Sequence, residues 1–252
     1  PAADMPHQPR RADHAVLPVR ELVGARERFT RMGFLVAPDA RHPFGTENCC
    51  VYLADGFYLE LLAVAQREEC ESAARHGNAF VARDQAWRFR NGDEGFSAVA
   101  FATLDADADH RAFHEASISG GRMLAFSRPF RQQDGSSALS SFRLAFAADM
   151  RSPDSFLFTC QRTGLQQAGR ERLEHHANGT AALSALVGVE ANPSDFQYFL
   201  QDVARQRHVR AHSFGMDLEL DGSTLSMLTP EGFRQFFGCE TAPAGRGMCW
   251  KA

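Results

Sequence analysis

A single glutamate, Glu60, stands in the middle of an apolar, β-prone stretch and carries the most distinctive chemistry in the sequence. Residues 48–54 and 57–62 are apolar on either side of an Asp-Gly turn dipeptide, which predicts an antiparallel hairpin. Side chains alternate along a strand, so Glu60 shares one face with Tyr58. An isolated buried carboxylate is costly and needs a hydrogen bond, an ion pair or a metal ion. A structural partner, a metal and a catalytic role therefore all remain open.

Two histidines are further candidates for chemistry at the same site. His14 lies beside Asp13 in a segment, 12–19, that reads as a buried strand, and His176 lies in the segment HHANGT. Imidazole can bind a divalent ion or move a proton near neutral pH, but a buried histidine can equally be a core residue satisfied by backbone. The Asn-Gly pair after His176 is a turn signal in its own right. Four other histidines lie in charged, solvent-facing contexts: His110, His114, His208 and His212.

Small polar residues before the hairpin offer contacts to a bound molecule. Thr46 and Asn48 could supply a hydroxyl and an amide to a substrate, or could simply shape the turn into the hairpin. The 21 phenylalanines against three tyrosines predict an aromatic interior and allow for an apolar pocket. The six cysteines show no CxxC spacing, which favours reduced, buried thiols.

Composition excludes several classes of function. The net charge of −4 and a pI near 6.2 give no basic stripe for nucleic acid. No apolar run reaches the length of a membrane span, and the polar, proline-rich start lacks the apolar centre of a signal peptide. We expect a cytoplasmic protein that binds neither nucleic acid nor membrane. No glycine-rich phosphate loop and no nucleophile elbow occurs in the sequence.

The predicted elements repeat in the order strand, helix, three strands. The first unit comprises a strand at 12–19, a helix at 20–32, a short strand at 34–36 and the hairpin. The second comprises a strand at 96–104, a helix at 105–118 and strands at 122–126, 138–147 and 155–161. A shorter third unit has a strand at 182–190, a helix after Asn192 and a hairpin at 216–228. Repetition on this scale predicts modules that pair face to face.

This repetition divides the sequence into five parts. We expect a flexible leader, a first βαβββ module, a helical connector, a second βαβββ module with the HHANGT segment, and a C-terminal half-module with its tail. The corresponding ranges are 1–11, 12–66, 67–95, 96–180 and 181–252.

The segments DHAVLPV, HPFGTEN and DGFYLELLAV, together with HHANGT, resemble those of the vicinal oxygen chelate superfamily and, more narrowly, of glyoxalase-like domain proteins. The resemblance implies a metal site on the concave face of the paired modules. His14 matches the first-strand ligand and Glu60 the fourth-strand ligand. Imidazole and carboxylate suit divalent zinc, iron, nickel or manganese.

The second module departs from the family pattern. Ala98 stands where the resemblance implies a histidine, and the fourth-strand position falls on or near Phe158, with Gln161 as the nearest polar residue. A site with two ligands is weak, so we expect either recruitment of His176 or loss of the metal. The predicted metal ligands are thus His14, Glu60 and His176, and the last two are also the catalytic candidates. The predicted substrate contacts are Thr46, Asn48, Tyr58, Phe158 and Gln161.

We therefore predict an α+β fold of paired βαβββ modules with an additional C-terminal βαββ half-module. The expected function is that of a divalent-metal-dependent enzyme of lyase, isomerase or dioxygenase type that acts on a small oxygenated molecule. The alternative is a metal-free protein that binds or sequesters a small molecule in the same apolar cup. The half-module has no sequential mate and carries many large apolar residues, among them Phe236 and Phe237. It must either pack against the first two modules within the chain or pair with its twin in a second copy, and we expect the homodimer.

Overall fold

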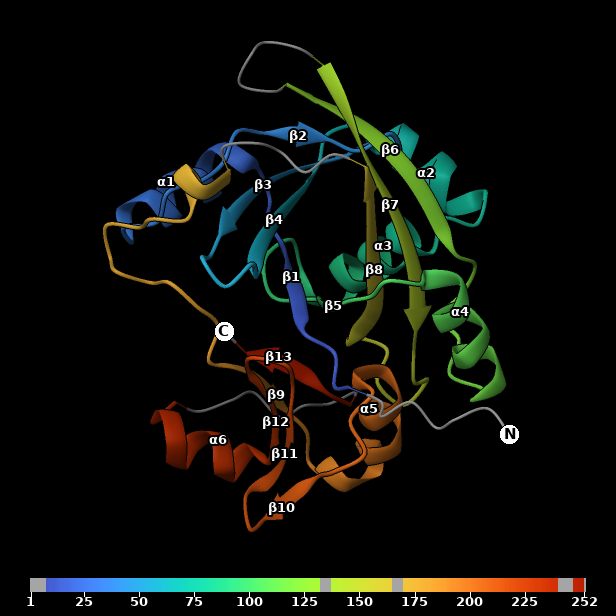
Figure 1. Ribbon diagram of the computed structural model, residues 1–252, viewed down its shortest axis with the longest axis vertical. Coiled ribbons are helices and arrows are strands. Elements are labelled where there is room, and N and C mark those ends of the chain that lie inside the picture. The colour runs from blue at the N-terminus through green and yellow to red at the C-terminus, as the bar shows by residue number, and fades with distance from the viewer. Residues whose placement is uncertain (1–7, 132–136, 165–169, 240–246, 252) are drawn as a thin grey trace.

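The computed structural model describes residues 8–131, 137–164, 170–239 and 247–251 of the chain. Two β-sheets organise these residues, one of eight strands and one of five (Figure 1). The eight-stranded sheet contains the first two modules in the order β2-β3-β4-β1-β5-β8-β7-β6, and the five-stranded sheet contains the third in the order β10-β11-β12-β9-β13. The α+β class with paired modules is thus confirmed.

The first module forms because its apolar segments are separated by strong turn signals. Its elements are β1 (Ala12–Pro18), α1 (Leu22–Arg31), β2 (Ala40–Arg41), β3 (Thr46–Tyr52) and β4 (Tyr58–Val64). Gly56 has a φ of 91°, a left-handed conformation that closes the β3–β4 hairpin at the Asp-Gly turn. Strands β1 and β4 run parallel and place Val16 opposite Glu60.

The strand predicted at 34–36 does not form. The second strand is the two-residue β2, which pairs with β3 opposite Asn48 and Glu47. The backbone of Phe34 instead returns to α1, where its amide donates to the carbonyl of Phe29, and the amide of Leu35 donates to the ring of His176. These residues close the helix turn, so they cannot join the sheet.

The second module repeats the first and joins it along one seam. Its elements are β5 (Ala98–Ala102), α4 (Ala106–Glu115), β6 (Leu124–Arg131), β7 (Ser137–Ala147) and β8 (Phe156–Gly164). Strands β1 and β5 pair antiparallel, with His14 opposite Ala100. Strand β5 then pairs in parallel with β8, as β1 does with β4, so the modules are related by an approximate two-fold axis.

Two connector helices fill part of the concave face between the modules. These are α2 (Arg67–Arg75) and α3 (Ala79–Asn91). Phe80 and Val81 from α3 pack in one apolar cluster with Phe146 and Phe158 of the second module. The connector therefore narrows the cup from inside, and the space left around Glu60 is small.

The C-terminal unit is a complete module rather than a half. After a short helix η1 (Arg170–Leu173), its elements are β9 (Ala185–Val189), η2 (Pro193–Phe196), α5 (Gln197–Ala204), β10 (Arg210–His212), β11 (Gly215–Glu219), β12 (Thr224–Leu228), α6 (Pro230–Phe237) and β13 (Cys249–Lys251). The sequence predicted the hairpin but not the short β10, which lies in a polar, arginine-rich segment. Strand β13 pairs antiparallel with β9, on the edge where β5 lies beside β1 in the larger sheet.

The third module packs against the outer face of the eight-stranded sheet within the same chain. Leu218, Met227 and Trp250 share one continuous apolar core with Ala15 and Val99. In Figure 1 this module lies below the larger sheet, beneath β1 and β5. Most of the apolar side chains that motivated the predicted homodimer are thus covered inside one chain, but Phe236 and Phe237 of α6 stay 60% and 51% exposed, and the dimer itself stays a prediction.

Part of the predicted leader contributes to this packing. The Arg10 backbone amide donates to the Ala204 carbonyl, and its Nε donates to the Val203 carbonyl. Its guanidinium pairs with Asp109 at 2.5 Å, and both side chains are buried. Arg10 therefore links α4 of the second module to α5 of the third. The first seven residues of the leader lie outside the described residues.

Two sequence expectations concern the whole chain. All six cysteines lie in the described part, and none of them is in a disulfide; four are buried, whereas Cys239 is exposed and Cys249 is partly exposed. No helix in the described ranges is both long enough and apolar enough to cross a membrane.

Candidate functional site

Glu60 lines a cavity of about 30 Å³ on the concave face of the eight-stranded sheet. Its side chain is buried and each carboxylate oxygen faces an imidazole. His14 Nε2 lies 3.6 Å from Oε2, and His42 Nε2 lies 3.6 Å from Oε1. The Asn48 amide donates a hydrogen bond to Oε1. Within the described residues, no lysine or arginine forms an ion pair with Glu60, so its charge is balanced only by these neutral or titratable groups.

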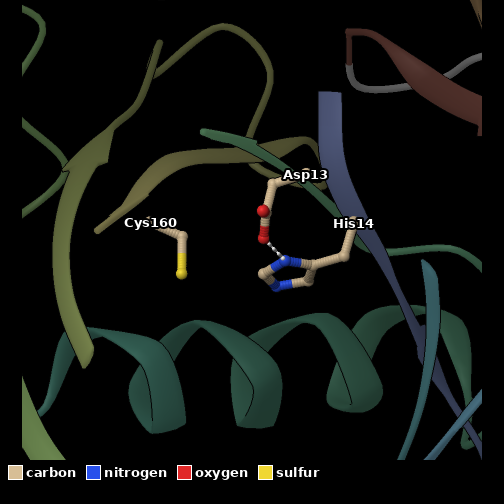
Figure 2. A group of neighbouring side chains, drawn as sticks. All are labelled: Asp13, His14 and Cys160. Carbon is tan, nitrogen blue, oxygen red and sulfur yellow. Dashed lines mark hydrogen bonds and ion pairs between the residues drawn. The ribbon is translucent and has the colours of Figure 1, made fainter. Parts of the chain in front are cut away.

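His14 is oriented by a chain of charges that crosses the module seam. Its Nδ1 lies 2.6 Å from Asp13 Oδ2 (Figure 2). Arg162 of β8 donates to the same oxygen at 2.5 Å. Burial alone would raise the pKa of Asp13, but Arg162 and the bond to His14 outweigh it and hold that pKa below its usual range. An ionised Asp13 accepts a hydrogen bond from Nδ1–H, so Nε2 is the ring nitrogen that faces Glu60. Tyr58 stacks on the ring at 4.5 Å.

His42 is oriented in the same way by a hydroxyl. It lies in the loop between β2 and β3, and its Nδ1 is 2.9 Å from Thr46 Oγ1. Burial lowers the pKa of His42 to about 4, although Glu60 acts in the opposite direction, so the ring is neutral at neutral pH. Phe44 stacks on it at 5.0 Å. The sequence reading did not single out His42, although it belongs to the HPFGTEN segment that carried the resemblance.

The second module supplies an apolar wall instead of further ligands. Phe158 of β8 faces the cavity and contacts the ring of His14 at 5.4 Å, edge to face. Ala98 lies in the same apolar cluster. Neither can bind a metal ion, as the sequence indicated. The remaining second-module residues of the cavity wall are Phe126, Arg128, Phe142, Leu144 and Cys160.

A second group of metal-binding atoms lies behind His14. One donor atom each from Asp13, His14 and Cys160 lies within 4.8 Å of the others, and Figure 2 shows the three side chains facing one another. The Asp13 oxygen is already shared by His14 and Arg162. Burial raises the pKa of the Cys160 thiol well above its usual value, which keeps the thiol protonated. This group therefore orients His14 and is a poor ligand set.

Six of the predicted site residues meet at the cavity, and two do not. His14, Asn48, Tyr58, Glu60 and Phe158 line it, and Thr46 supports His42 from behind.

His176 and Gln161 have structural partners elsewhere. His176 accepts from the Leu35 amide through Nδ1, and its Nε2 lies 2.9 Å from the Tyr52 carbonyl, so both ring nitrogens are used. Gln161 accepts from the Ala106 amide at the start of α4 and donates to the Leu104 carbonyl. Neither side chain is brought to the cavity.

An open cleft of about 620 Å³ adjoins the cavity at the rim of the cup. His42, Asn48 and Arg128 line both spaces and form the neck between them. Arg128 of β6 donates to Asn48 Oδ1 at 3.1 Å, which joins the rims of the two modules. A ligand in the cleft would thus meet Arg128 before it reached Glu60.

The sequence and the fold were compared with known proteins. A family model described as a glyoxalase-like domain matches residues 12–204, which confirms the resemblance seen in the sequence. No curated protein matches the sequence.

Among solved structures, a hypothetical protein from Staphylococcus aureus has a TM-score of 0.63 at 14% identity, covering 86% of this chain and 85% of its own. A Streptomyces coelicolor methylmalonyl-CoA epimerase in complex with 2-nitronate-propionyl-CoA is 22% identical, with a TM-score of 0.41 and coverage of 61% and 98%. The first likeness extends over most of both chains and shows the fold alone.

Proposed function

Because this chain belongs to the glyoxalase-like domain family, we propose that it is a divalent-metal-dependent enzyme whose metal ligands are His14, His42 and Glu60. One observation carries the proposal. Two imidazoles present Nε2 to separate oxygens of one buried carboxylate, each at 3.6 Å. All three come from the first module, so the set does not need the missing second-module ligands. Two histidines and one carboxylate form a donor set typical of iron and also suited to zinc, manganese or nickel.

The surroundings of these residues fit a metal ion. Metal-binding histidines usually use their second nitrogen in a hydrogen bond to a carboxylate or another oxygen, and Asp13 and Thr46 supply those partners. His42 is neutral at neutral pH because burial lowers its pKa, so it need not lose a proton to bind. Among the described side chains, no lysine or arginine forms an ion pair with the carboxylate of Glu60, so it has no permanently charged partner. A bound cation would supply the missing charge.

The residues around the ligands suggest how a small oxygenated substrate would be handled. A divalent ion at this site would act as a Lewis acid on adjacent oxygens of the substrate. Asn48 donates to Oε1 of Glu60 through its amide, and Oε2, which lies 3.6 Å from His14 Nε2, is the oxygen that would accept a proton. Tyr58 and Phe158 exclude water from one side of His14. A reaction of lyase, isomerase or dioxygenase type would fit this arrangement.

Metal content is the decisive test of this proposal. Protein purified without an affinity tag should contain close to one zinc, iron, manganese or nickel ion per chain by elemental analysis. After treatment with a chelator, calorimetric titration should show that His14→Gln, His42→Gln and Glu60→Gln each weaken metal binding at least tenfold. His110→Ala and His114→Ala are controls, since these residues lie on the outer helix α4. Absence of metal from the wild type, or equal loss in the controls, would contradict the proposal.

A metal-free binding protein is the second candidate, and the apolar wall favours it. Ala98 and Phe158 stand at the two positions where ligands are missing, and phenylalanine rings line much of the cavity. This candidate predicts that wild type and Glu60→Gln bind the same apolar molecule equally well, with no metal present in either. The enzyme proposal predicts that the substitution weakens substrate binding.

A further inference from the structure

Arg128 lines the cup, and no carboxylate in the described part of the chain forms an ion pair with it. Arg83 of α3 also lacks a carboxylate partner among these residues, but it lines a separate pocket and lies over the Phe156 ring. The one hydrogen bond of Arg128 to the described residues runs from Nη1 to the side-chain oxygen of Asn48. The guanidinium carbon lies 5.4 Å from the centre of the Phe142 ring, which restrains the plane of the group. The side chain is half-buried and keeps most of its N–H donors unused.

Neighbouring arginines, in contrast, have carboxylate partners. Arg26 pairs with Asp39 on the rim of the cleft, and Arg41 lies 3.7 Å from Glu47. Arg162 pairs with Asp13 inside the fold. A charged group that is partly removed from water and has no counterion is costly, so its retention at this neck calls for a partner that arrives from outside.

The position of Arg128 determines where that partner must lie. It lines both the cleft of about 620 Å³ and the small cavity that contains Glu60. Asn48 contacts Arg128 through its oxygen and Glu60 through its amide, so Arg128 and Glu60 are one side chain apart. The negative charge of Glu60 repels an anion from the inner cavity, whereas Arg128 attracts it to the neck. An anionic molecule would therefore bind with its charge at Arg128.

We propose that Arg128 is a specificity residue that recognises a carboxylate or phosphate group of an organic anion bound in the cleft. A guanidinium donates two parallel hydrogen bonds to the oxygens of either group. The bound anion replaces Asn48 Oδ1 as the acceptor, and the uncharged part of the molecule lies between Arg128 and the Glu60 cavity. A reaction of this molecule at Glu60 rests on the proposed function, whereas recognition of its anionic group by Arg128 is independent of that function.

The first test compares charged and neutral probes of similar shape on chelator-treated wild type. Phenylacetate, phenyl phosphate and neutral phenylacetamide are titrated, and binding is followed by chemical-shift changes of backbone amides. At least one of the two anions should bind about tenfold more tightly than phenylacetamide, and the preference should shrink as salt is raised. Which anion binds better distinguishes a carboxylate from a phosphate. Equal binding of all three probes, or none, would overturn the proposal.

The second test assigns the preference to Arg128. Arg128→Gln should bind the anions and phenylacetamide alike, whereas Arg41→Gln should keep the wild-type preference, since Arg41 lies on the same cleft with an exposed, weakly paired side chain. Arg128→Lys keeps the charge but loses the paired donors, so an intermediate preference is expected. A wild-type preference that survives in Arg128→Gln would overturn the assignment.

The two proposals fail in different ways. Anion titrations on Glu60→Gln, without metal, should still show a preference that depends on Arg128. If the wild type holds no metal but this preference is present, the proposed enzyme is wrong and the anion site stands. If metal is bound and the anions show no preference, only the anion site is wrong.

Discussion

At the scale of single residues, the site depends on how each polar side chain is held from behind. Glu60 meets two imidazoles, and each imidazole is fixed by a different partner, the carboxylate of Asp13 or the hydroxyl of Thr46. Burial lowers the pKa of His42, and its partner Thr46 carries no charge, so this ring is neutral at neutral pH.

The pH dependence of stability should reveal His42. Its pKa is about 4 in the folded chain and near 6.5 when exposed, so between these values the unfolded chain binds more protons. Unfolding free energy should therefore fall as the pH drops from 6.5 to 4, with a total loss of about 3 kcal/mol from this residue. Urea denaturation of His42→Gln should lack that loss. The exposed His175→Gln is the control, and an unchanged pH profile in His42→Gln would contradict the buried, neutral ring.

Arg162 should be important for stability because it neutralises buried Asp13. Replacing Arg162 with Met leaves that carboxylate uncompensated and should lower the free energy of unfolding by about 3–5 kcal/mol at pH 7. The pKa of Asp13 is lower in the folded chain than its unfolded value of 3.8, so its ionisation stabilises the fold above pH 3.8. This stabilisation is lost as the pH falls through the folded pKa. The difference in stability between wild type and Arg162→Met should therefore narrow below that pH. Arg143→Met removes an exposed pair with Asp107 and should cost about 0–1 kcal/mol. Equal losses in both variants would contradict this account.

Sequence alone identified the residues of the site that lie on strands. Alternation within one hairpin placed Glu60 and Tyr58 on one face, Asn48 was noted as a polar donor beside that hairpin, and His14 followed from the family resemblance. His42 and Arg128 were missed because a loop conformation and a contact between modules bring them in, and neither leaves a periodic signal. His176 was assigned to the site on its motif, but its two ring nitrogens are used by backbone groups that are remote in sequence.

At the scale of elements, the loop before β3 decides whether His42 reaches the cavity. Gly45 closes this loop with a φ of 91°, and its carbonyl accepts from the amides of Ala65 and Gln66. A Cβ on Gly45 would lie 2.6 Å from the Gln66 carbonyl oxygen. The glycine is therefore required both by backbone conformation and by the close approach of the following helix.

Gly45→Ala should thus cost more than a substitution that adds backbone strain alone. We expect a loss of about 2–4 kcal/mol, from positive φ together with the clash. Gly222→Ala is the matched control, because its φ is 87° but no atom lies within 4 Å of the added Cβ, so about 1 kcal/mol is expected. Urea denaturation of both variants measures the difference. Equal losses would mean that the Gln66 carbonyl moves aside easily.

Most helices and strands could be predicted because turn signals and apolar periodicity agree. The Asp-Gly hairpins and the helix over Leu22–Arg31 follow from these patterns. The two short strands could not be predicted from these patterns. The strand Ala40–Arg41 and the strand Arg210–His212 carry charged residues and pair at sheet edges, so tertiary contact rather than local propensity places them.

At the scale of the whole molecule, the third module acts as a cover for the first two. Its inner residues Leu218 and Met227 are fully buried in the core that also holds Val99 and Leu157. The sequence predicted that this unit carried too many large apolar groups for water. It could not say whether they pack within the chain, since packing between modules has no sequence period.

A chain shortened to end at Thr180 should therefore be unstable. Removal of the third module exposes the outer face of the β1–β5 seam, and each large apolar side chain left in water costs about 1.5–3 kcal/mol. We expect low soluble yield and aggregation in light scattering, compared with the full chain measured in parallel, which also tests the predicted dimer. A soluble, monomeric short chain with the thermal stability of the full chain would show that the modules are independent.

The two walls of the cup differ in chemistry, and this difference allows ligand specificity to change separately from the candidate metal site. The candidate metal ligands all come from the first module, whereas the second module contributes Arg128 at the neck and an apolar wall of Phe126, Phe142 and Phe158. Substitutions among large apolar side chains on that wall leave Glu60 and the two histidines that face it unchanged. Natural variation or laboratory selection can therefore remodel which molecules fit without rebuilding the reactive centre. A second module without metal ligands can thus set the shape of the binding site independently of its chemistry.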